Sequence, residues 1–531
     1  MPRPLLSLVQ TASFLAALAL RAAAAGGACE HVLFVTIDGL HAADLDDPRL
    51  AADLPNVAAL RKVGVTFTNA FTPVPTDSFC GLLSEFAGAG PKTTGIYYDH
   101  AYDRALYPAG SSPAALPGAP LESNGEIDWN KALLGGGEPS GTGSGPAGSA
   151  SINPAKLEGR KVDGKMTPVY PHELLKVNTI FEVAHAAGRR TAYIDKHPAC
   201  EMLNGPSGTG LDDFYAPESD AKVKLEGSGA DAHLVDAMTS SSGKKGLGKI
   251  SGSIDLSNAY DDLRLAALLH QIDGKTSSGE AAPKDMVPAI FGMNFVALGN
   301  AQRLVDGGID ATNGPSAALH LALNHIDASV GRVVSELKAR GLFDKTLIVL
   351  TAKHGNAPRI GAARLLPTST YTIALLNAGI QVATVEQDDS VLLWLKDPKQ
   401  TAQAKVALKS APGVETIYAG ASELVAAGFG DPASDERTPD VIIKLQPGYI
   451  VSDSKKRAEH GGFSEDDTHV ALVLASGALP AELRGSSQTG IVSTNQIAVT
   501  ALQALGLDAG KLQGAVAEKT PPLPGTGISV R

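Results

Sequence analysis

Apolar runs that end in polar or charged residues recur along this chain. The run at 32–37 reads Val-Leu-Phe-Val-Thr-Ile without regular polar alternation, which is typical of a strand buried on both faces of a parallel α/β sheet. Further strands are predicted at 65–68, 191–194, 288–293 and 346–351. The pattern therefore favours a sheet that is covered on both sides.

Helical spacing of apolar residues separates these strands. The longest such segment, 316–340, has its apolar residues on one side and Gly341 as its stop. Shorter helices are predicted at 50–63, 79–87, 178–187 and 493–505. Strand, polar residue and helix alternate at least five times, which predicts an α/β fold with a doubly wound, mostly parallel sheet.

The length and the changes of composition indicate how this fold is divided. A chain of 531 residues is too long for one simple core. Short β-like runs between 381 and 446 predict a small inserted α+β subdomain, and tracts rich in Gly, Pro and Ser predict long loops. The expected parts are a leader at 1–25, a core at 26–380 with loop excursions at 107–170 and 239–252, the subdomain at 381–446, and the remainder of the core at 447–531.

The leader and the net charge limit where the protein acts and on what. Residues 1–25 resemble a secretory signal peptide, with Arg3 before an apolar stretch and small residues after it, so we expect a secreted protein. No later apolar run is long enough to span a membrane. The net charge of −11 argues against a nucleic-acid-binding surface but permits a small anionic substrate. The sequence leaves the oligomeric state open.

Three cysteines are too few for a disulfide framework. Cys80 and Cys200 both fall beside candidate site residues. Two free, buried thiols are the preferred interpretation, and an oxidised pair is the alternative.

Residues with chemical roles follow several predicted strands. Asp38 comes directly after the first strand, Ser78 opens an apolar helix, and Lys353 and His354 follow the strand at 346–351. In α/β sheets the ligand crevice lies beyond the carboxyl ends of the strands. A carboxylate there must be paired or bind a metal, because burying it alone is costly. The pattern therefore predicts an active site.

Five segments, in this order, resemble the alkaline-phosphatase-like superfamily and in particular its type I phosphodiesterase/nucleotide pyrophosphatase branch. They are Val-Thr-Ile-Asp-Gly at 35–39, Pro-Thr-Asp-Ser-Phe at 75–79, Thr-Ala-Lys-His-Gly at 351–355, Thr-Pro-Asp at 438–440 and Glu-His-Gly-Gly at 459–462. The resemblance implies two divalent metal ions, usually zinc, and hydrolysis through a covalent phospho-enzyme.

The resemblance also assigns roles residue by residue. Asp38 matches a metal ligand, Ser78 the nucleophile that also contacts a metal, and His354 and His460 two metal-binding histidines. A serine at a helix N-terminus also meets the positive end of the helix dipole, which favours its alkoxide and an incoming anion.

The segment 195–198, Asp-Lys-His-Pro, ends another strand and faces the same crevice. It looks similar to phosphonoacetate hydrolase, a superfamily member that carries lysines at the comparable place. We therefore interpret Lys196 and His197 as substrate-binding residues; a surface ion pair for Lys196 and a structural role for His197 are the alternatives.

Two departures from the family pattern affect the metal sites. Lys353 stands where the family has an aspartate, and Asn294 with Leu298 stands where it has an aspartate and a histidine. Three outcomes remain open. One metal ion is kept by Asp38, Ser78 and His354 or by His460 with Asn294; Lys353 takes the place of a metal as a catalytic residue; or the site is inert.

We therefore predict an exported hydrolase of phosphate esters, and within this class a phosphodiesterase, with Ser78 as nucleophile. A sulfatase or phosphonate hydrolase on the same fold is one alternative, although no Cys-x-Pro-x-Arg segment occurs at Ser78. A non-catalytic binding protein with a degenerate metal site is the other.

Overall fold

The computed structural model describes residues 29–137, 146–228, 231–282 and 286–528. Within these residues the central sheet has eight strands in the order β25-β2-β24-β16-β1-β13-β8-β9. All neighbouring pairs are parallel except those that β24 makes with β2 and β16. The strands are β25 (Ser486–Gln488), β2 (Gly64–Phe67), β24 (Leu472–Ala475), β16 (Thr346–Thr351), β1 (His31–Ile37), β13 (Ile290–Phe295), β8 (Ala192–Ile194) and β9 (Asp213–Tyr215). The prediction of a mostly parallel α/β sheet is confirmed.

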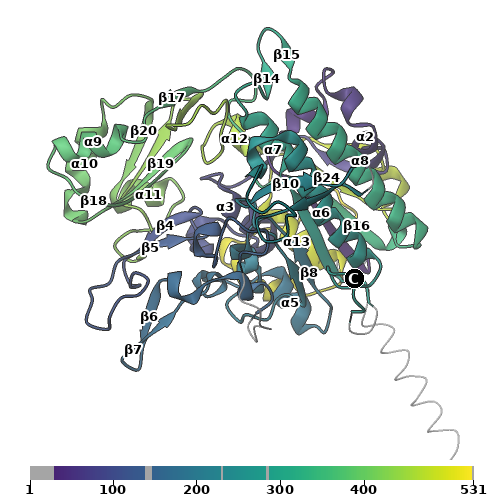
Figure 1. Ribbon diagram of the computed structural model, residues 1–531, viewed down its shortest axis with the longest axis horizontal. Helices are drawn as coiled ribbons and strands as arrows, with labels where there is room; N and C mark the ends of the chain where they lie inside the picture. The colour runs from purple at the N-terminus through teal and green to yellow at the C-terminus, as the bar shows by residue number, and fades with distance from the viewer. Residues whose placement is uncertain (1–28, 138–145, 229–230, 283–285, 529–531) are drawn as a thin grey trace, which may run out of the picture.

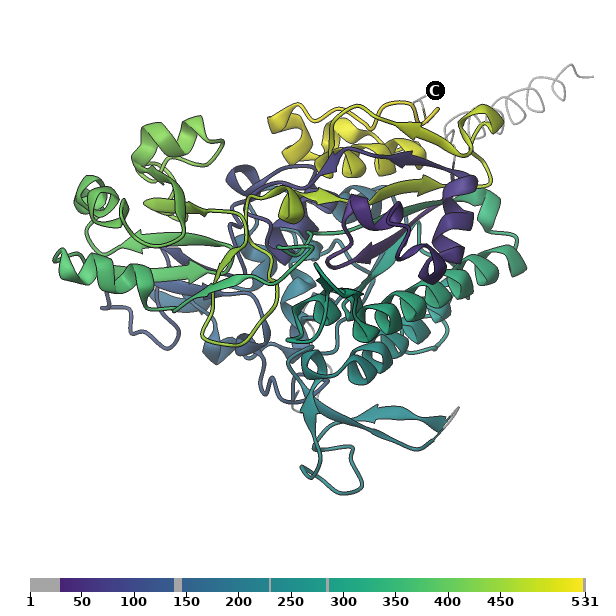
Figure 2. The ribbon, with the colours of Figure 1, turned by 90° about the horizontal axis from the view of Figure 1, so that it is seen from above.

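Helices cover both faces of this sheet, as Figures 1 and 2 show. One layer holds α3 (Ser78–Ala87), α5 (Ile180–Ala186) and α13 (Asn495–Ala504), and the other holds α2 (Pro55–Lys62), α6 (Ile254–Ile272), α7 (Ala297–Arg303) and α8 (Ala317–Ala339). The side chains of β1 alternate between the layers. Phe34 packs with Phe86 of α3 in one core, while Leu33 and Val35 pack with Leu323 of α8 in the other. This alternation explains why the run has no regular alternation of apolar and polar residues.

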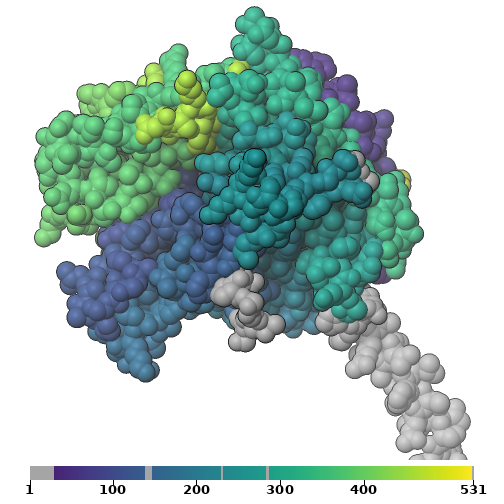
Figure 3. All heavy atoms as spheres, viewed as in Figure 1, coloured from purple at the N-terminus to yellow at the C-terminus, as the bar shows by residue number. Residues whose placement is uncertain are grey.

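A second sheet forms a lobe beside the main body, green in Figures 1 and 3. It is antiparallel, in the order β18-β19-β21-β20, and has its own apolar core. Its elements are β18 (Val382–Gln387), β19 (Ser390–Leu395), β20 (Val414–Ala419), β21 (Val441–Leu445), α9 (Thr370–Asn377), α10 (Thr401–Leu408) and α11 (Gly420–Ala426). The sheet falls within the predicted subdomain at 381–446, and the division of the whole chain into domains stays a prediction.

Short hairpins occupy much of the region expected to be loop at 107–170. β5 (Ala119–Glu122) pairs with β4 (His100–Asp103), and β6 (Gly159–Val162) pairs with β7 (Lys165–Pro168). β4 also packs against β18, so this region connects the main body to the lobe. The second expected excursion, 239–252, contains β12 (Gly248–Lys249), which pairs with β10 (Lys222–Glu226).

Several expectations concern particular segments. The predicted leader at 1–25 lies outside the described residues. Among the helices that the structure does describe, none has the length and apolar character that crossing a bilayer requires. Cys80 and Cys200 are both free and buried.

Candidate active site

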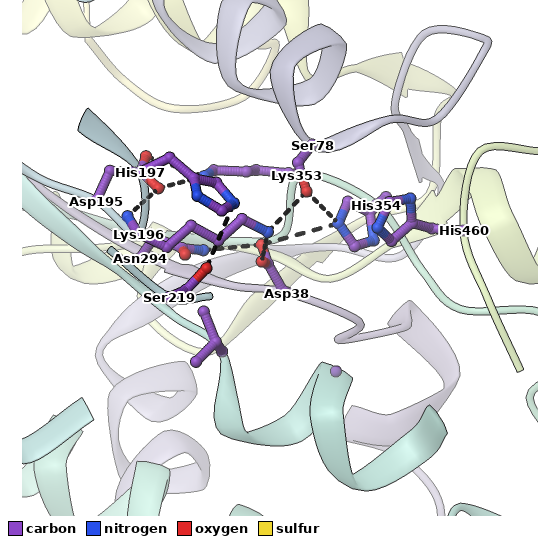
Figure 4. A network of polar contacts seen from close by, with 12 residues as sticks. Asp38, Ser78, Asp195, Lys196, His197, Ser219, Asn294, Lys353, His354 and His460 are labelled. Atoms are coloured by element: carbon purple, nitrogen blue, oxygen red, sulfur yellow. Dashed lines mark hydrogen bonds and ion pairs between the residues drawn. The ribbon is translucent and has the colours of Figure 1, made fainter. Parts of the chain in front are cut away.

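The candidate site lies at the carboxyl ends of four adjacent parallel strands, β16, β1, β13 and β8. Asp38 directly follows β1, Lys196 lies two residues beyond β8, and His354 lies three residues beyond β16. Asn294 is the penultimate residue of β13, in register with Thr36 of β1. The fold thus brings residues that are far apart in sequence to one edge of the sheet, as Figure 4 shows.

Ser78 is the first residue of α3, and Asp77 caps this helix by accepting a hydrogen bond from the backbone N–H of Phe79 at 2.8 Å. All ten residues of α3 are buried, so the apolar run that follows Ser78 fixes its position against the sheet. The Ser78 side chain lines a cavity of about 400 Å³ together with Lys196, His197 and Arg303. Ser78 is therefore buried yet borders a cavity.

Two side chains contact the Ser78 hydroxyl. The Lys196 ammonium group donates a hydrogen bond to Ser78 Oγ at 2.9 Å, and His354 Nε2 lies 3.0 Å from the same oxygen. His354 Nδ1 lies 3.0 Å from the carbonyl oxygen of Gly355, which can only accept a hydrogen bond. The proton of the neutral ring is therefore on Nδ1, and Nε2 is free to accept the Ser78 proton.

Asp38 is held by two donors. Lys196 Nζ lies 2.8 Å from Asp38 Oδ2, and Asn294 Nδ2 donates to Asp38 Oδ1 at 2.8 Å. His354 Nε2 lies 3.9 Å from Asp38 Oδ1. Burial acts to raise the pKa of Asp38, but the ammonium groups of Lys196 and Lys353 outweigh it and hold the pKa well below its ordinary value. Asp38 is therefore a carboxylate at neutral pH.

The two site histidines are neutral at pH 7. Burial is the main cause that lowers the pKa of His354, to about 4, and the nearby Lys196 charge adds to it. Burial and the neighbouring His354 lower the pKa of His460 well below its ordinary value. Their ring centroids are 3.9 Å apart. His460 thus contacts the base of the site but does not hydrogen-bond to Ser78.

Lys353 points to a different carboxylate. Its ammonium group lies 2.9 Å from each carboxylate oxygen of Asp195, and no contact joins it to Ser78 among the described residues. The catalytic role predicted for Lys353 has no direct contact with the nucleophile to support it. Asp195 was visible in the sequence at the same strand end as Lys196, but its partner depends on which strand ends are neighbours.

His197 forms a second group at the cavity. His197 Nδ1 lies 2.9 Å from the buried carboxylate of Glu218, and its ring stacks at 6.3 Å on Phe79. Burial lowers the pKa of this ring, but Glu218 reverses the effect and raises it above its ordinary value. Glu218 was missed in the sequence, because it lies just beyond β9, a three-residue strand that the apolar pattern did not predict.

The comparisons with known proteins agree with this geometry. The chain matches the family described as Type I phosphodiesterase / nucleotide pyrophosphatase over residues 32–128 and 280–470, which is more than half of its length. This sheet and site define a hydrolase of phosphate esters, and the chain belongs to the type I phosphodiesterase/nucleotide pyrophosphatase family. No curated protein matches the sequence.

Solved structures show the same fold. Murine ectonucleotide pyrophosphatase/phosphodiesterase 5, in complex with AMP, is 12% identical over 90% of this chain and 96% of its own, with a TM-score of 0.58. The human enzyme is 13% identical over the same shares, with a TM-score of 0.53. The alkaline phosphatase PafA is 13% identical over 94% of this chain and 99% of its own, with a TM-score of 0.61. At these identities the likeness concerns the fold.

The family is generally metal-dependent, but the first implied metal position does not fit the residues found here. Lys196 Nζ contacts Asp38 Oδ2 and Ser78 Oγ, the two oxygens that a metal ion would bind. A divalent ion about 4 Å from an ammonium group is repelled by about 8 kcal/mol at an effective dielectric constant of about 20. The lysine and a metal ion therefore exclude each other.

The second implied position lacks ligands. Asn294 Oδ1 and His460 Nδ1 are buried without hydrogen-bond partners, and Leu298 stands where the family has a histidine. Two neutral donors are fewer than the three protein ligands that a catalytic zinc ion ordinarily has. A two-zinc centre does not fit this chain.

One other group in the described part of the chain has the geometry to hold a metal ion. Donor atoms of Asp99, His100 and Glu386 lie within 4.8 Å of one another where β4 meets β18. His100 is already paired there, because its Nδ1 lies 3.1 Å from Asp99 and its Nε2 lies 2.7 Å from Glu122. None of these residues was predicted as a metal ligand.

Proposed function

We propose that this chain is an exported hydrolase of phosphodiesters in which Ser78 attacks phosphorus and forms a covalent phosphoserine. One observation carries the proposal. Ser78 Oγ lies between the Lys196 ammonium group, at 2.9 Å, and the free Nε2 of His354, at 3.0 Å. A hydroxyl with a base on one side and a fixed positive charge on the other is an activated nucleophile.

The reaction has two steps. In the first, a bond forms between Ser78 Oγ and phosphorus, the bond to the leaving oxygen breaks, and His354 accepts the Ser78 proton. The leaving oxygen takes a proton from a water molecule, which becomes hydroxide. In the second, this hydroxide attacks phosphorus, the bond to Ser78 breaks, and His354 gives its proton to the Ser78 oxygen and becomes neutral again. Together these steps consume one water molecule and release an alcohol and a phosphate monoester.

The charges in the site support a diester as substrate. Lys196 and Lys353 are paired with Asp38 and Asp195, and Arg303 and Lys456 both pair with Glu459. These seven groups carry four positive and three negative charges, so the single negative charge of a diester balances them, whereas a monoester brings up to two. AMP, found on the murine relative, is the monoester that hydrolysis of a nucleotide diester would release.

Export is proposed from the signal-like residues 1–25. Mass spectrometry of the N-terminus of the mature protein tests it. Protein that is confined to the cytoplasm with residues 1–25 intact would contradict export.

The nucleophile is tested with Ser78→Ala against bis(4-nitrophenyl) phosphate. We expect turnover to fall at least about 1,000-fold, as when other hydrolases lose their nucleophile. Rapid acid quenching of the wild-type enzyme during this reaction, followed by peptide mass spectrometry, should find a 4-nitrophenyl phosphoryl group on Ser78. Ser207→Ala, at an exposed turn, is the control and should keep wild-type turnover.

Undiminished turnover by Ser78→Ala would refute this role. The monoester 4-nitrophenyl phosphate and the ester 4-nitrophenyl sulfate are assayed alongside. Faster turnover of the sulfate would identify a sulfatase instead.

A further inference from the structure

Lys196 occupies a fixed position in the site. Its backbone N–H donates to Asp195 Oδ1 at 2.8 Å, and its carbonyl accepts a hydrogen bond from the backbone N–H of Ser219 at 2.9 Å. The hydroxyl of Tyr260 donates to the same carbonyl at 3.2 Å. The residue is only 8% exposed. Because its backbone is held from both sides, the side chain reaches the site from a defined direction.

The Lys196 ammonium group makes the two contacts that define a catalytic cation. It lies 2.8 Å from Asp38 Oδ2 and 2.9 Å from Ser78 Oγ, so it joins the buried carboxylate to the nucleophile (Figure 4). Ammonium groups have three protons, and these contacts use two of them. Lys196 also lines the cavity that Ser78 borders. The remaining proton can therefore serve an anionic oxygen of a bound ester.

The charged side chains around Ser78 already neutralise one another without a further cation. Asp38 is neutralised by Lys196, and Asp195 by Lys353, so the four groups sum to zero. Among the described residues, one other carboxyl group is hydrogen-bonded to β1, that of Glu85, which accepts from Thr36 Oγ1 at 3.0 Å. Burial raises the pKa of Glu85 to about 8, so it is mostly uncharged at pH 7. In a metal-dependent site, by contrast, unpaired carboxylates supply the negative charge that binds the ion.

We propose that the Lys196 ammonium group takes the place of the metal ion and that Ser78 is activated without one. This inference rests on the proposed function for its catalytic consequence. Lys196 keeps its three protons throughout and only donates hydrogen bonds, first to the developing Ser78 alkoxide and then to a phosphoryl oxygen. The Ser78 proton goes to His354, so no proton is gained or lost at the lysine.

The residue identified here differs from the one that the sequence singled out. Lys353 stands at the position of a family metal ligand, but its ammonium group is shared between the two oxygens of Asp195. Lys196 reaches the metal position from a different strand. The positive charge that replaces the metal ion therefore lies on Lys196, after β8. Lys353, after β16, forms a second, separate pair with Asp195.

The first test measures metal content and chelator sensitivity. The wild-type protein, purified without added metal and then incubated with zinc and desalted, is analysed by mass spectrometry for bound metal. We expect far less than one zinc ion per chain at the site. Hydrolysis of bis(4-nitrophenyl) phosphate should be unchanged after treatment with 1,10-phenanthroline. One or two tightly bound zinc ions per chain, removed together with the activity, would overturn the inference.

If the wild-type protein binds zinc, an Asp99→Asn variant shows where. Zinc that this variant still binds would belong to the Ser78 site and would overturn the inference. Zinc that is lost in this variant would belong to the group formed by Asp99, His100 and Glu386, and it would leave the expected metal-free Ser78 site in place.

The second test removes the ammonium group. Lys196→Ala should lose at least 100-fold in kcat, and added primary alkylamines should restore part of it, because a free ammonium ion can enter the space that the side chain leaves. A purely structural role for Lys196 predicts no rescue. Lys196→Arg is the conservative variant and should retain more activity than Lys196→Ala, and Lys409→Met, exposed on the lobe, should behave as wild type.

The same variant offers a readout that needs no activity. In Lys196→Ala the donors Asp38, Ser78 and His354 lose their competing cation, so zinc should bind and raise the melting temperature, as it should not in the wild type. If neither protein hydrolyses any ester, the proposed function fails, and this comparison still decides the inference. Equal zinc binding by the two proteins would overturn it.

Discussion

The ammonium group of Lys353 lies 2.9 Å from both carboxylate oxygens of Asp195, and both side chains are at most 1% exposed. Burial acts to lower the pKa of Lys353, but Asp195 and Asp38 outweigh it and raise the pKa. Both members are charged, and each depends on the other, because a lone charge in this environment would be costly.

Breaking this pair should destabilise the protein strongly. Lys353→Met leaves the Asp195 carboxylate unpaired, and Asp195→Asn leaves the lysine unpaired. Each is expected to lower the free energy of unfolding by about 3–5 kcal/mol. The double variant should lose less than the sum of the two, as measured by chemical denaturation. Strictly additive losses would show that the two side chains do not depend on each other.

His354 should affect kcat rather than substrate binding. His354→Ala removes the acceptor of the Ser78 proton, and the loss of a general base ordinarily lowers kcat by about 100- to 10,000-fold. KM for bis(4-nitrophenyl) phosphate should change little. Steady-state kinetics measure both, with the exposed His233→Ala as control. An unchanged kcat would mean that another group takes the proton.

Glu218 should control the affinity for anionic substrates. It lies 2.9 Å from His197 Nδ1 and raises the pKa of that ring, so Glu218 favours a positive charge beside the cavity. Glu218→Gln keeps the shape and removes the charge. A hydrogen bond to a charged group contributes about 1.5–3 kcal/mol, so we expect KM to rise roughly 10- to 100-fold. Glu436→Gln, exposed on the lobe, serves as control, and a KM equal to the wild-type value in Glu218→Gln would refute this role.

Glu85 should make the stability fall as the pH rises. Its folded-state pKa of about 8, raised by burial, lies above that of an exposed glutamate, about 4.3. Between these values the native state holds a proton that the unfolded state releases. The contribution of Glu85 to the free energy of unfolding is therefore complete below about pH 4. It decreases by roughly 1 kcal/mol per pH unit up to about pH 8. Melting temperatures at pH 6 and pH 8 should differ more for the wild type than for Glu85→Gln; equal slopes would contradict this origin.

The regular elements of the main body could be predicted wherever one apolar face repeats. The segment expected at 316–340 is α8, Ala317–Ala339, and the run at 32–37 lies within β1. The 19-residue helix α6 was not predicted. Asp261 and Arg264 lie on its buried side and pair with each other, so polar residues interrupt the apolar stripe that would have revealed it. A periodic pattern fails where a helix buries a charge pair.

Ser78 reaches the site as the first residue of α3, whereas the convergence of Asp38 and His354 followed from one rule, that side chains after parallel strands meet at one edge of a sheet. The partners of the two lysines did not follow from it. Lys196 and Lys353 both come after strands, and their assignment to Asp38 or Asp195 depends on which strand ends are adjacent and how each side chain is directed. The roles predicted for these residues stay predictions until the variants are assayed.

The positive charge beside Ser78 is part of the polypeptide itself, bonded to a backbone held between Asp195 and Ser219. Such a charge is present from synthesis onward in a fixed ratio of one per chain. It cannot be extracted by a scavenging ligand, displaced by a competing ion or diluted when the protein leaves the cell. An enzyme built in this way would keep working in surroundings depleted of trace elements.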